Sequence, residues 1–263
     1  LEAAIEHDLE NSYHPLCAIA TIGTTGSTAI DPLKAMGDIC QKYNVWLHVD
    51  AAFAGTALLL PEVRWMIEGI ENADTFVFNP HKWMFTNFDC SAYFVKDKAA
   101  LISTFEILPE YLKTAVDKQV NNYRDWGIQL GRRFRALKLW FVIRSFGVTG
   151  LQAKIRQHIQ LGQKFAACLR ESANFELLAP IPLNTVCFRY HPPEIDDEEK
   201  LNQLNAELLA RLNSSGKLYL THTKLNRRYT LRMIIGQTNV EKRHVDKAWE
   251  LIISTAHQLN TFS

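Results

Sequence analysis

Two short segments place side chains that could do chemistry directly after apolar, strand-like runs. The first covers residues 48–52 and reads His-Val-Asp-Ala-Ala, and the second covers 79–83 and reads Asn-Pro-His-Lys-Trp. In open α/β sheets, ligands bind beyond the carboxyl ends of the strands. We therefore expect Asp50 and Lys82 to be carried, as buried charges, to one common site.

A buried aspartate and a buried lysine are each costly unless a compensating partner lies beside them. A pyridine ring that carries an aldehyde would use both of them. The amine of Lys82 could form a Schiff base with the aldehyde. The carboxylate of Asp50 could keep the ring nitrogen protonated, which makes the ring an electron sink. The small side chains of Ala51 and Ala52 leave room for a flat ring at the strand end.

Two other interpretations of these residues remain open. His48 and Asp50 are two residues apart on a strand, so their side chains would point to the same face. With His81 they could form a site of two histidines and one carboxylate for iron. That site leaves Lys82 without a role. Alternatively, Asp50 and Lys82 could form a structural ion pair with each other.

The elements that must position these residues alternate between strand and helix in the first half of the chain. Apolar runs predict strands at 17–22, 45–49, 75–78 and 90–95, with helical patterns between them, which indicates an α/β sheet. A long helix is predicted from Gly131 to a stop at Gly147, and another from 149 to 172. We expect a domain covering residues 1–148.

The remainder, 149–263, is predicted to be a small α+β domain. A strand at 184–190 and a helix around 201–212 precede a hairpin of strands 218–223 and 229–235. Thr238 and Glu241 have the spacing of a capping box that would open the last helix.

Composition limits the class of protein. The 263 residues carry a formal net charge of +1 and are 47% hydrophobic, which is ordinary for a globular chain and gives no reason to expect nucleic acid or membrane partners. Apolar runs are too short for a membrane span, and the start lacks the pattern of a signal peptide. The five cysteines are scattered, which favours reduced thiols in the cytoplasm and no structural metal. The opening residues look like the tail of an amphipathic helix, so we expect a preceding part of the subunit to be missing.

The two segments together resemble the pattern of the group II pyridoxal-phosphate decarboxylases of fold type I. The runs Asn-Phe-Asp-Cys-Ser at 87–91 and Leu-Gly-Arg-Arg-Phe-Arg-Ala-Leu-Lys-Leu-Trp at 130–140 are similar to the aromatic-L-amino-acid branch. The resemblance covers essentially the whole chain. It implies part of a fold type I transferase-like large domain, a complete small domain, pyridoxal 5'-phosphate as the cofactor, and a homodimer with its site at the interface. The phosphate cradle of the family would precede Leu1.

The resemblance also implies roles for individual residues around the cofactor. Lys82 would hold it as a Schiff base, Asp50 would pair with the ring nitrogen, and Ala52 would pack against one face of the ring. Thr25 and Asn79 would lie beside it, although Thr25 would suit an ordinary polar turn equally well.

Four further assignments concern the substrate. His81 would bond the cofactor phosphate or the substrate carboxylate region, and Tyr111, in a mobile loop near 103–122, would protonate the substrate carbon after carbon dioxide leaves. Phe88 would line the substrate pocket. Gly131 stands where histidine decarboxylases tend to carry serine, which favours a large aromatic ring. As structural alternatives, His81 would suit a buried core position and Phe88 plain packing.

The resemblance thus implies decarboxylation of an aromatic L-amino acid (tryptophan, DOPA, tyrosine or phenylalanine) to its amine and carbon dioxide. Histidine decarboxylation, an aromatic aldehyde synthase reaction and a catalytically silent relative remain as alternatives.

Overall fold

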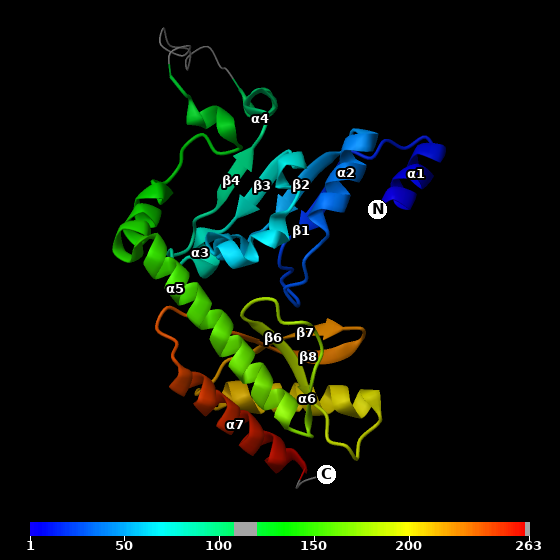
Figure 1. The fold of residues 1–263 in the computed structure, drawn as a ribbon, viewed down its shortest axis with the longest axis vertical. Helices are drawn as coiled ribbons and strands as arrows, with labels where there is room; N and C mark the ends of the chain where they lie inside the picture. The colour runs from blue at the N-terminus through cyan, green and yellow to red at the C-terminus, as the bar shows by residue number, and fades with distance from the viewer. Residues whose placement is uncertain (108–119, 261–263) are drawn as a thin grey trace.

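The computed structural model of the chain describes residues 1–107 and 120–260, and within them the first half forms one mixed sheet. Its strands, in spatial order, are β1 (Cys17–Thr21), β2 (Trp46–Asp50), β3 (Thr75–Phe78) and β4 (Ala92–Val95). The β1, β2 and β3 strands run parallel, and β4 returns antiparallel to β3. The α/β sheet that the sequence predicts is therefore present (Figure 1).

Helices and short 3-10 turns connect and flank these strands. They are α1 (Glu2–Glu10), α2 (Leu33–Tyr43), η1 (Ala54–Leu59), η2 (Pro61–Ile67), η3 (Ile70–Asn72), α3 (Pro80–Trp83), α4 (Lys98–Phe105) and η5 (Tyr123–Trp126). The α2 helix ends at Asn44, whose φ of 53° is the left-handed geometry of a helix C-terminus. The chain can then turn directly into β2.

The first sheet buries only one of its two faces in the described part of the chain. Along β1 the side chain of Ala20 is fully buried, whereas its neighbour Ile19 is 60% exposed. In β2, Leu47 is buried and Trp46 is 36% exposed. Continuous apolar runs such as 17–22 are typical of strands buried on both faces, but none of the described residues covers this face of the sheet.

A long helix, α5 (Arg135–Glu171), connects the two halves of the molecule (Figure 1). Gly147 interrupts it with φ 64° and ψ 174°, a backbone conformation that a residue with a Cβ rarely adopts. The helix stop that the sequence predicts at Gly147 is thus a kink. The predicted start at Gly131 is wrong, because the helix begins at Arg135.

The second half forms an antiparallel sheet with two helices. Its strands, in spatial order, are β5 (Phe175–Leu177), β6 (Thr185–Tyr190), β8 (Arg228–Ile234) and β7 (Thr221–Leu225), and its helices are α6 (Glu198–Ser214) and α7 (Lys242–Asn260). The hairpin between β7 and β8 turns at Asn226 and Arg227, whose positive φ values suit a tight hairpin turn. The capping box predicted for Thr238 and Glu241 is wrong. The last helix begins at Lys242, and the amide of Glu241 donates to Nδ1 of His244.

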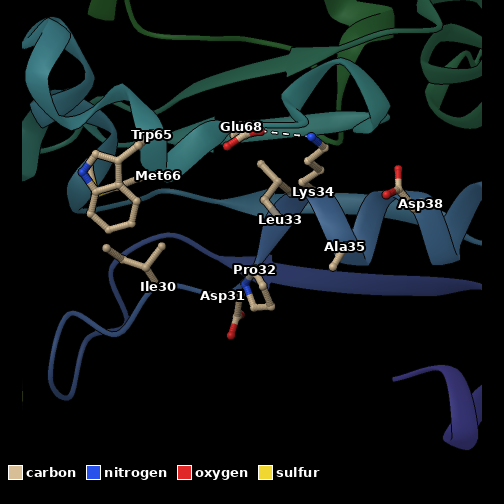
Figure 2. Close-up of a pocket in the computed structure, with 10 residues that line it drawn as sticks. All are labelled: Ile30, Asp31, Pro32, Leu33, Lys34, Ala35, Asp38, Trp65, Met66 and Glu68. Carbon is tan, nitrogen blue, oxygen red and sulfur yellow. Dashed lines mark hydrogen bonds and ion pairs between the residues drawn. The ribbon is translucent and has the colours of Figure 1, made fainter.

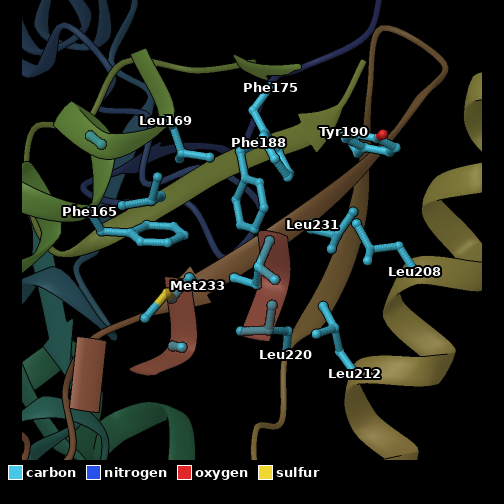
Figure 3. Packing of buried hydrophobic residues seen from close by; sticks show 14 of the residues in the cluster. Phe165, Leu169, Phe175, Phe188, Tyr190, Leu208, Leu212, Leu220, Leu231 and Met233 are labelled. Carbon is cyan, nitrogen blue, oxygen red and sulfur yellow. The ribbon is translucent and has the colours of Figure 1, made fainter. Parts of the chain in front are cut away.

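The core of this half lies between the second sheet and α5, α6 and α7. Phe165 from α5 packs edge-on against Phe188 of β6, with ring centroids 5.3 Å apart, and Leu231 and Met233 of β8 join them (Figure 3). A separate core forms under the first sheet and includes Ile155 of α5. Because that core extends past residue 148, α5 packs against both cores, and the boundary near 148 stays a prediction.

None of the helices in the described ranges is both long enough and apolar enough to cross a membrane.

Candidate functional site

The two segments singled out in the sequence lie side by side at the carboxyl ends of β2 and β3. The amide of Asn79 donates to the carbonyl oxygen of Ala52 at 3.0 Å, and the amide of Ala51 donates to the carbonyl oxygen of Val77 at 2.9 Å. Parallel pairing of β2 with β3 brings both strand ends to one edge of the sheet. The structure therefore brings these two segments together, as the sequence predicts.

Lys82 lies on the single turn of α3, which follows β3 directly. Its amide donates to the carbonyl oxygen of Asn79 at 2.9 Å, and Pro80 occupies the first helical position. The side chain of Lys82 is exposed, so the expectation of a buried charge is wrong. The physical reason is the change from strand to helix, which directs Lys82 out into an open pocket while the next residue, Trp83, is buried.

That pocket has a volume of about 240 Å³ and lies where the first half of the chain meets the second sheet. Its lining residues are Thr24, Thr25, Thr28, Phe53, Lys82, Thr185, Thr221, Arg232 and Ile234. Five are threonines, two are cations and none carries a carboxylate. Among the described residues Lys82 forms no ion pair, so its amine is available to a ligand.

Arg232 of β8 ties the two halves together at this pocket. It is 9% exposed, and its Nε donates to the carbonyl oxygen of Gly26 at 2.8 Å while Nη1 donates to Oγ1 of Thr221 at 2.9 Å. A further bond runs from Nη2 to the carbonyl oxygen of Thr25. The turn at 24–26 is thus held by a side chain from the second sheet, and Thr25 faces the same pocket as Lys82.

Asp50 is the last residue of β2 and is partly buried. Its Oδ1 accepts the amide of Ala52 at 2.9 Å, which holds the carboxylate beside the turn that leaves the strand. Within the described residues Oδ2 accepts no hydrogen bond, so it remains open to a protonated nitrogen of a ligand. Asp50 and Lys82 do not pair with each other, so the interpretation as a structural ion pair is not supported.

The His81 ring is oriented by the backbone of Cys90. Its Nδ1 lies 2.7 Å from the carbonyl oxygen and 3.0 Å from the amide nitrogen of Cys90. Phe88 packs edge-on against the ring with centroids 4.9 Å apart, and is itself 81% exposed. The structure therefore brings Phe88 to His81, and the alternative of core packing for Phe88 is wrong.

Three predicted site residues remain, namely Asn79, Gly131 and Tyr111. The side chain of Asn79 accepts a hydrogen bond from Oγ of Ser91 at 2.5 Å. Gly131 is exposed, and a Cβ added to it would meet no atom within 4 Å, so the structure does not bring it to Lys82. Tyr111 lies outside the described residues, as does most of the loop predicted near 103–122, whose first three residues belong to α4.

The iron interpretation of the first segment lacks geometric support. Nδ1 of His48 lies 2.8 Å from Oγ1 of Thr75 on the neighbouring strand. Across residues 1–107 and 120–260 no group of three or more histidine, cysteine or acidic side chains is placed to hold a metal ion.

Two larger pockets in the described part of the chain differ from the one at Lys82. Figure 2 shows one of about 500 Å³ between α2 and η2, where Lys34 and Glu68 form an exposed ion pair at 3.1 Å. Another, of about 450 Å³, is lined by Phe76, Phe78 and other apolar side chains. Lys34 and Lys96 line two other described pockets, and their amines are bonded to Glu68 and to the carbonyl oxygen of Glu71. The amine of Lys82 has no such partner among the described residues.

Two buried residues near the site were missed by the sequence reasoning. Arg232 occupies a polar position of the alternating strand β8, so the sequence pattern gave no signal that it would be buried. His158 lies in the apolar stripe of α5 between Ile155 and Leu161, where an isolated histidine could have been noticed. Both lie in the second half of the chain, far in sequence from the two segments.

His158 is fully buried against the residue that follows Lys82. Nε1 of Trp83 donates to its Nδ1 at 3.0 Å. Burial, and after it the positive charge of Lys154, lowers the pKa of His158 from 6.5 to about 4. The ring is therefore neutral at pH 7 and can accept this hydrogen bond.

The fold and the site agree with the pyridoxal-phosphate type of protein that the sequence predicts, and similarity to known proteins gives its class. The model of the pyridoxal-dependent decarboxylase conserved domain matches residues 1–191, so the chain belongs to the pyridoxal-dependent decarboxylase family. The predicted family and the fold type I architecture are confirmed.

Among its relatives, tyrosine decarboxylase 2 from Arabidopsis thaliana is 46% identical over 96% of this chain and 46% of its own length. Phenylacetaldehyde synthase from a Rosa hybrid cultivar is 45% identical over 96% of this chain and 51% of its own. The solved structure of Oryza sativa TDC with PLP and tryptamine superposes with a TM-score of 0.95 at 38% identity, covering 98% of this chain and 54% of that one. The chain thus spans about half the length of the relatives it matches.

Proposed function

We propose that the full-length protein uses pyridoxal phosphate to decarboxylate an aromatic L-amino acid to its amine and carbon dioxide. The observation that carries the proposal is the available amine of Lys82 in a pocket without carboxylates, next to a strand end where Asp50 keeps one oxygen open. A primary amine suits the aldehyde of this cofactor and a carboxylate suits its ring nitrogen, so the residues present fit these two groups.

We assign the following roles to the residues around the cofactor. Lys82 would bind the cofactor covalently, Asp50 would hold the proton on its ring nitrogen, and Ala52 would pack against the ring. When bound, the cofactor supplies an electron sink for the electrons of the broken carbon–carboxylate bond. His81, whose ring orientation is fixed by Cys90, would orient the substrate carboxylate or the cofactor phosphate.

Four more residues complete this proposal. Thr25, in the pocket with Lys82, and Asn79 would lie beside the cofactor. Tyr111 would deliver a proton to the substrate Cα. Phe88, exposed and in contact with His81, would contact the aromatic ring of the substrate, and Gly131 would leave space for that ring in the assembled protein.

The covalent role of Lys82 is tested by trapping. Full-length protein loaded with pyridoxal phosphate is reduced with borohydride, digested and analysed by mass spectrometry. We expect the cofactor label on Lys82 and its absence in Lys82→Ala, because no other described side chain that lines this pocket carries an amine. Lys96→Ala is the matched control, since Lys96 follows β4 of the same sheet and its Nζ bonds the carbonyl of Glu71. A label that persists in Lys82→Ala would refute the assignment.

The reaction type is tested with a panel of tryptophan, DOPA, tyrosine, phenylalanine and histidine. We expect amine from the aromatic substrates and little from histidine, because relatives at similar identity act, by their names, on tyrosine or form phenylacetaldehyde. Aldehyde as the main product would assign the second candidate function, aromatic aldehyde synthesis. Lack of turnover with a normally bound cofactor would indicate a silent relative, and preference for histidine would contradict the proposed role of Gly131.

We further propose a cytoplasmic homodimer with the site at its interface and a domain division near residue 148. The exposed apolar face of the first sheet and the exposed aromatic residues Trp140 and Phe141 on α5 support the burial of further surface in the assembled protein.

A further inference from the structure

The residue after Lys82 is anchored more firmly than Lys82 itself. Trp83 has no exposed surface, and its ring stacks on Phe53 with centroids 5.0 Å apart and planes 6° from parallel. Its indole nitrogen donates to Nδ1 of His158 at 3.0 Å. Neighbouring residues on this turn thus have opposite surroundings, with Lys82 exposed in the pocket and Trp83 packed in the core.

A helix of one turn does not hold its own geometry. The α3 helix spans only Pro80–Trp83, too short for its internal hydrogen bonds to stabilise it. A backbone bond from the amide of His81 to the carbonyl oxygen of Cys90 holds one end of it, together with the His81 ring on Cys90. At the other end the side chain of Trp83 contacts Phe53 and His158. The direction of Lys82 therefore depends on how its neighbours are held.

His158 is placed to hold Trp83 in one orientation. It is fully buried on α5, roughly parallel to the Trp83 ring at an interplanar angle of 16°, with Phe85 perpendicular to it at 5.8 Å. Because Nδ1 accepts the indole N–H, the proton of the neutral ring is on Nε2. The groups acting on its protonation are Lys154 of the same helix and the backbone at Gln237, whereas the rings from α3 and its following loop carry no charge.

We propose that His158 is a positioning residue that, by accepting the Trp83 indole hydrogen bond, fixes the α3 turn and the direction in which Lys82 enters the pocket. The effect of His158 on cofactor binding rests on the proposed function of Lys82, whereas its effect on the direction of the Lys82 side chain does not. A fixed side-chain direction would restrict the orientations of the Lys82 amine before it attacks the aldehyde carbon of the cofactor. Less entropy would then be lost when the covalent bond forms. The inference links the second half of α5 to the reactive lysine.

The test compares two substitutions that differ in hydrogen bonding. In His158→Leu the apolar side chain keeps the site filled but cannot accept from Trp83. In His158→Asn the amide oxygen can occupy the place of Nδ1 and accept the same bond. The first measurement is competitive acetylation of full-length protein without cofactor, with Lys82 labelling expressed relative to Lys96. The second is the rate at which the same protein binds pyridoxal phosphate covalently, and urea midpoints report stability alongside.

We expect His158→Leu to change the relative labelling of Lys82 and to slow covalent cofactor binding by roughly tenfold, the scale of one lost buried hydrogen bond. In His158→Asn the relative labelling of Lys82 and the rate of covalent cofactor binding should return towards the original values. We expect this even if the urea midpoint of His158→Asn is as low as that of His158→Leu. A purely structural role would instead make both measurements follow the urea midpoint.

The outcomes separate this inference from the proposed function. Lys82 labelling that responds to His158, in a protein that never binds the cofactor at Lys82, would support positioning and refute the proposed function. Unchanged labelling and unchanged binding in His158→Leu would overturn positioning. Equal defects in His158→Asn and His158→Leu would also overturn it, because the hydrogen bond would then have no separate effect.

Discussion

Asp50→Asn should lower kcat of the full-length protein by about 10²–10³-fold, the effect of removing one preorganised electrostatic group from an active site. Asparagine has nearly the same shape, and its oxygen can still accept the amide of Ala52, so the strand end stays intact. The lost charge can no longer hold a proton on the ring nitrogen, which weakens the electron sink. Steady-state kinetics with the preferred substrate gives kcat, and borohydride trapping shows whether Lys82 still binds the cofactor.

The matched control is Asp74→Asn. Asp74 also accepts a strand amide through its side chain, that of Leu47 at 2.8 Å, but it lies at the start of β3, at the opposite edge of the same sheet. We expect this variant to keep kcat within about twofold, the usual scale for a change remote from the chemistry. Equal losses in both variants would mean that Asp50 acts through the fold and not on the cofactor.

Acidification should destabilise the protein through His158. Its pKa is lowered to about 4 in the folded state by burial, whereas an unfolded histidine titrates near 6.5. The unfolded chain therefore binds more protons between these values, so the stability from this group is fully present above pH 6.5 and is lost as the pH falls towards 4. The loss amounts to about 3 kcal/mol, from 1.36 kcal/mol for each pKa unit.

Urea unfolding at a series of pH values from neutral to about 4 measures this effect. Because carboxylates also titrate in this range, the informative quantity is the difference in pH dependence between the original protein and His158→Asn, which has no imidazole. His222→Asn, at an exposed position on β7, should keep the full pH dependence. If His158→Asn is as acid-sensitive as the original protein, His158 is not the group responsible.

The sequence predicted the first sheet well because its strands are short apolar runs that end at polar residues. The same pattern identified Asp50 and Lys82, since each follows such a run, and the parallel pairing brings them to one edge. Exposure of Lys82 was not predictable from the pattern. It depends on a switch to a single helical turn at Pro80, and the preceding apolar residues gave no sign of it.

What the sequence could not reveal was which distant residues complete the pocket. Arg232 lies in a hairpin strand with ordinary alternation, and only tertiary packing shows that its guanidinium reaches the turn at 24–26. His158 belongs to a regular amphipathic stripe, so its partnership with Trp83 also depends on how α5 crosses the first core. Gly131 was predicted as a pocket residue only from the family resemblance. A Cβ added to it would meet no described atom within 4 Å.

The bond between Arg232 and the carbonyl oxygen of Gly26 joins positions 206 residues apart in the sequence. Contacts of such separation form late in folding, because the entropy of closing a long loop is repaid only after both ends are structured. The edge of the first sheet with Asp50 can form from nearer segments, whereas the α3 turn also depends on His158 of α5. We therefore expect a nascent chain to present Lys82 before the side of the pocket formed by Thr185, Thr221 and Arg232 exists, so that cofactor capture follows completion of the last hairpin.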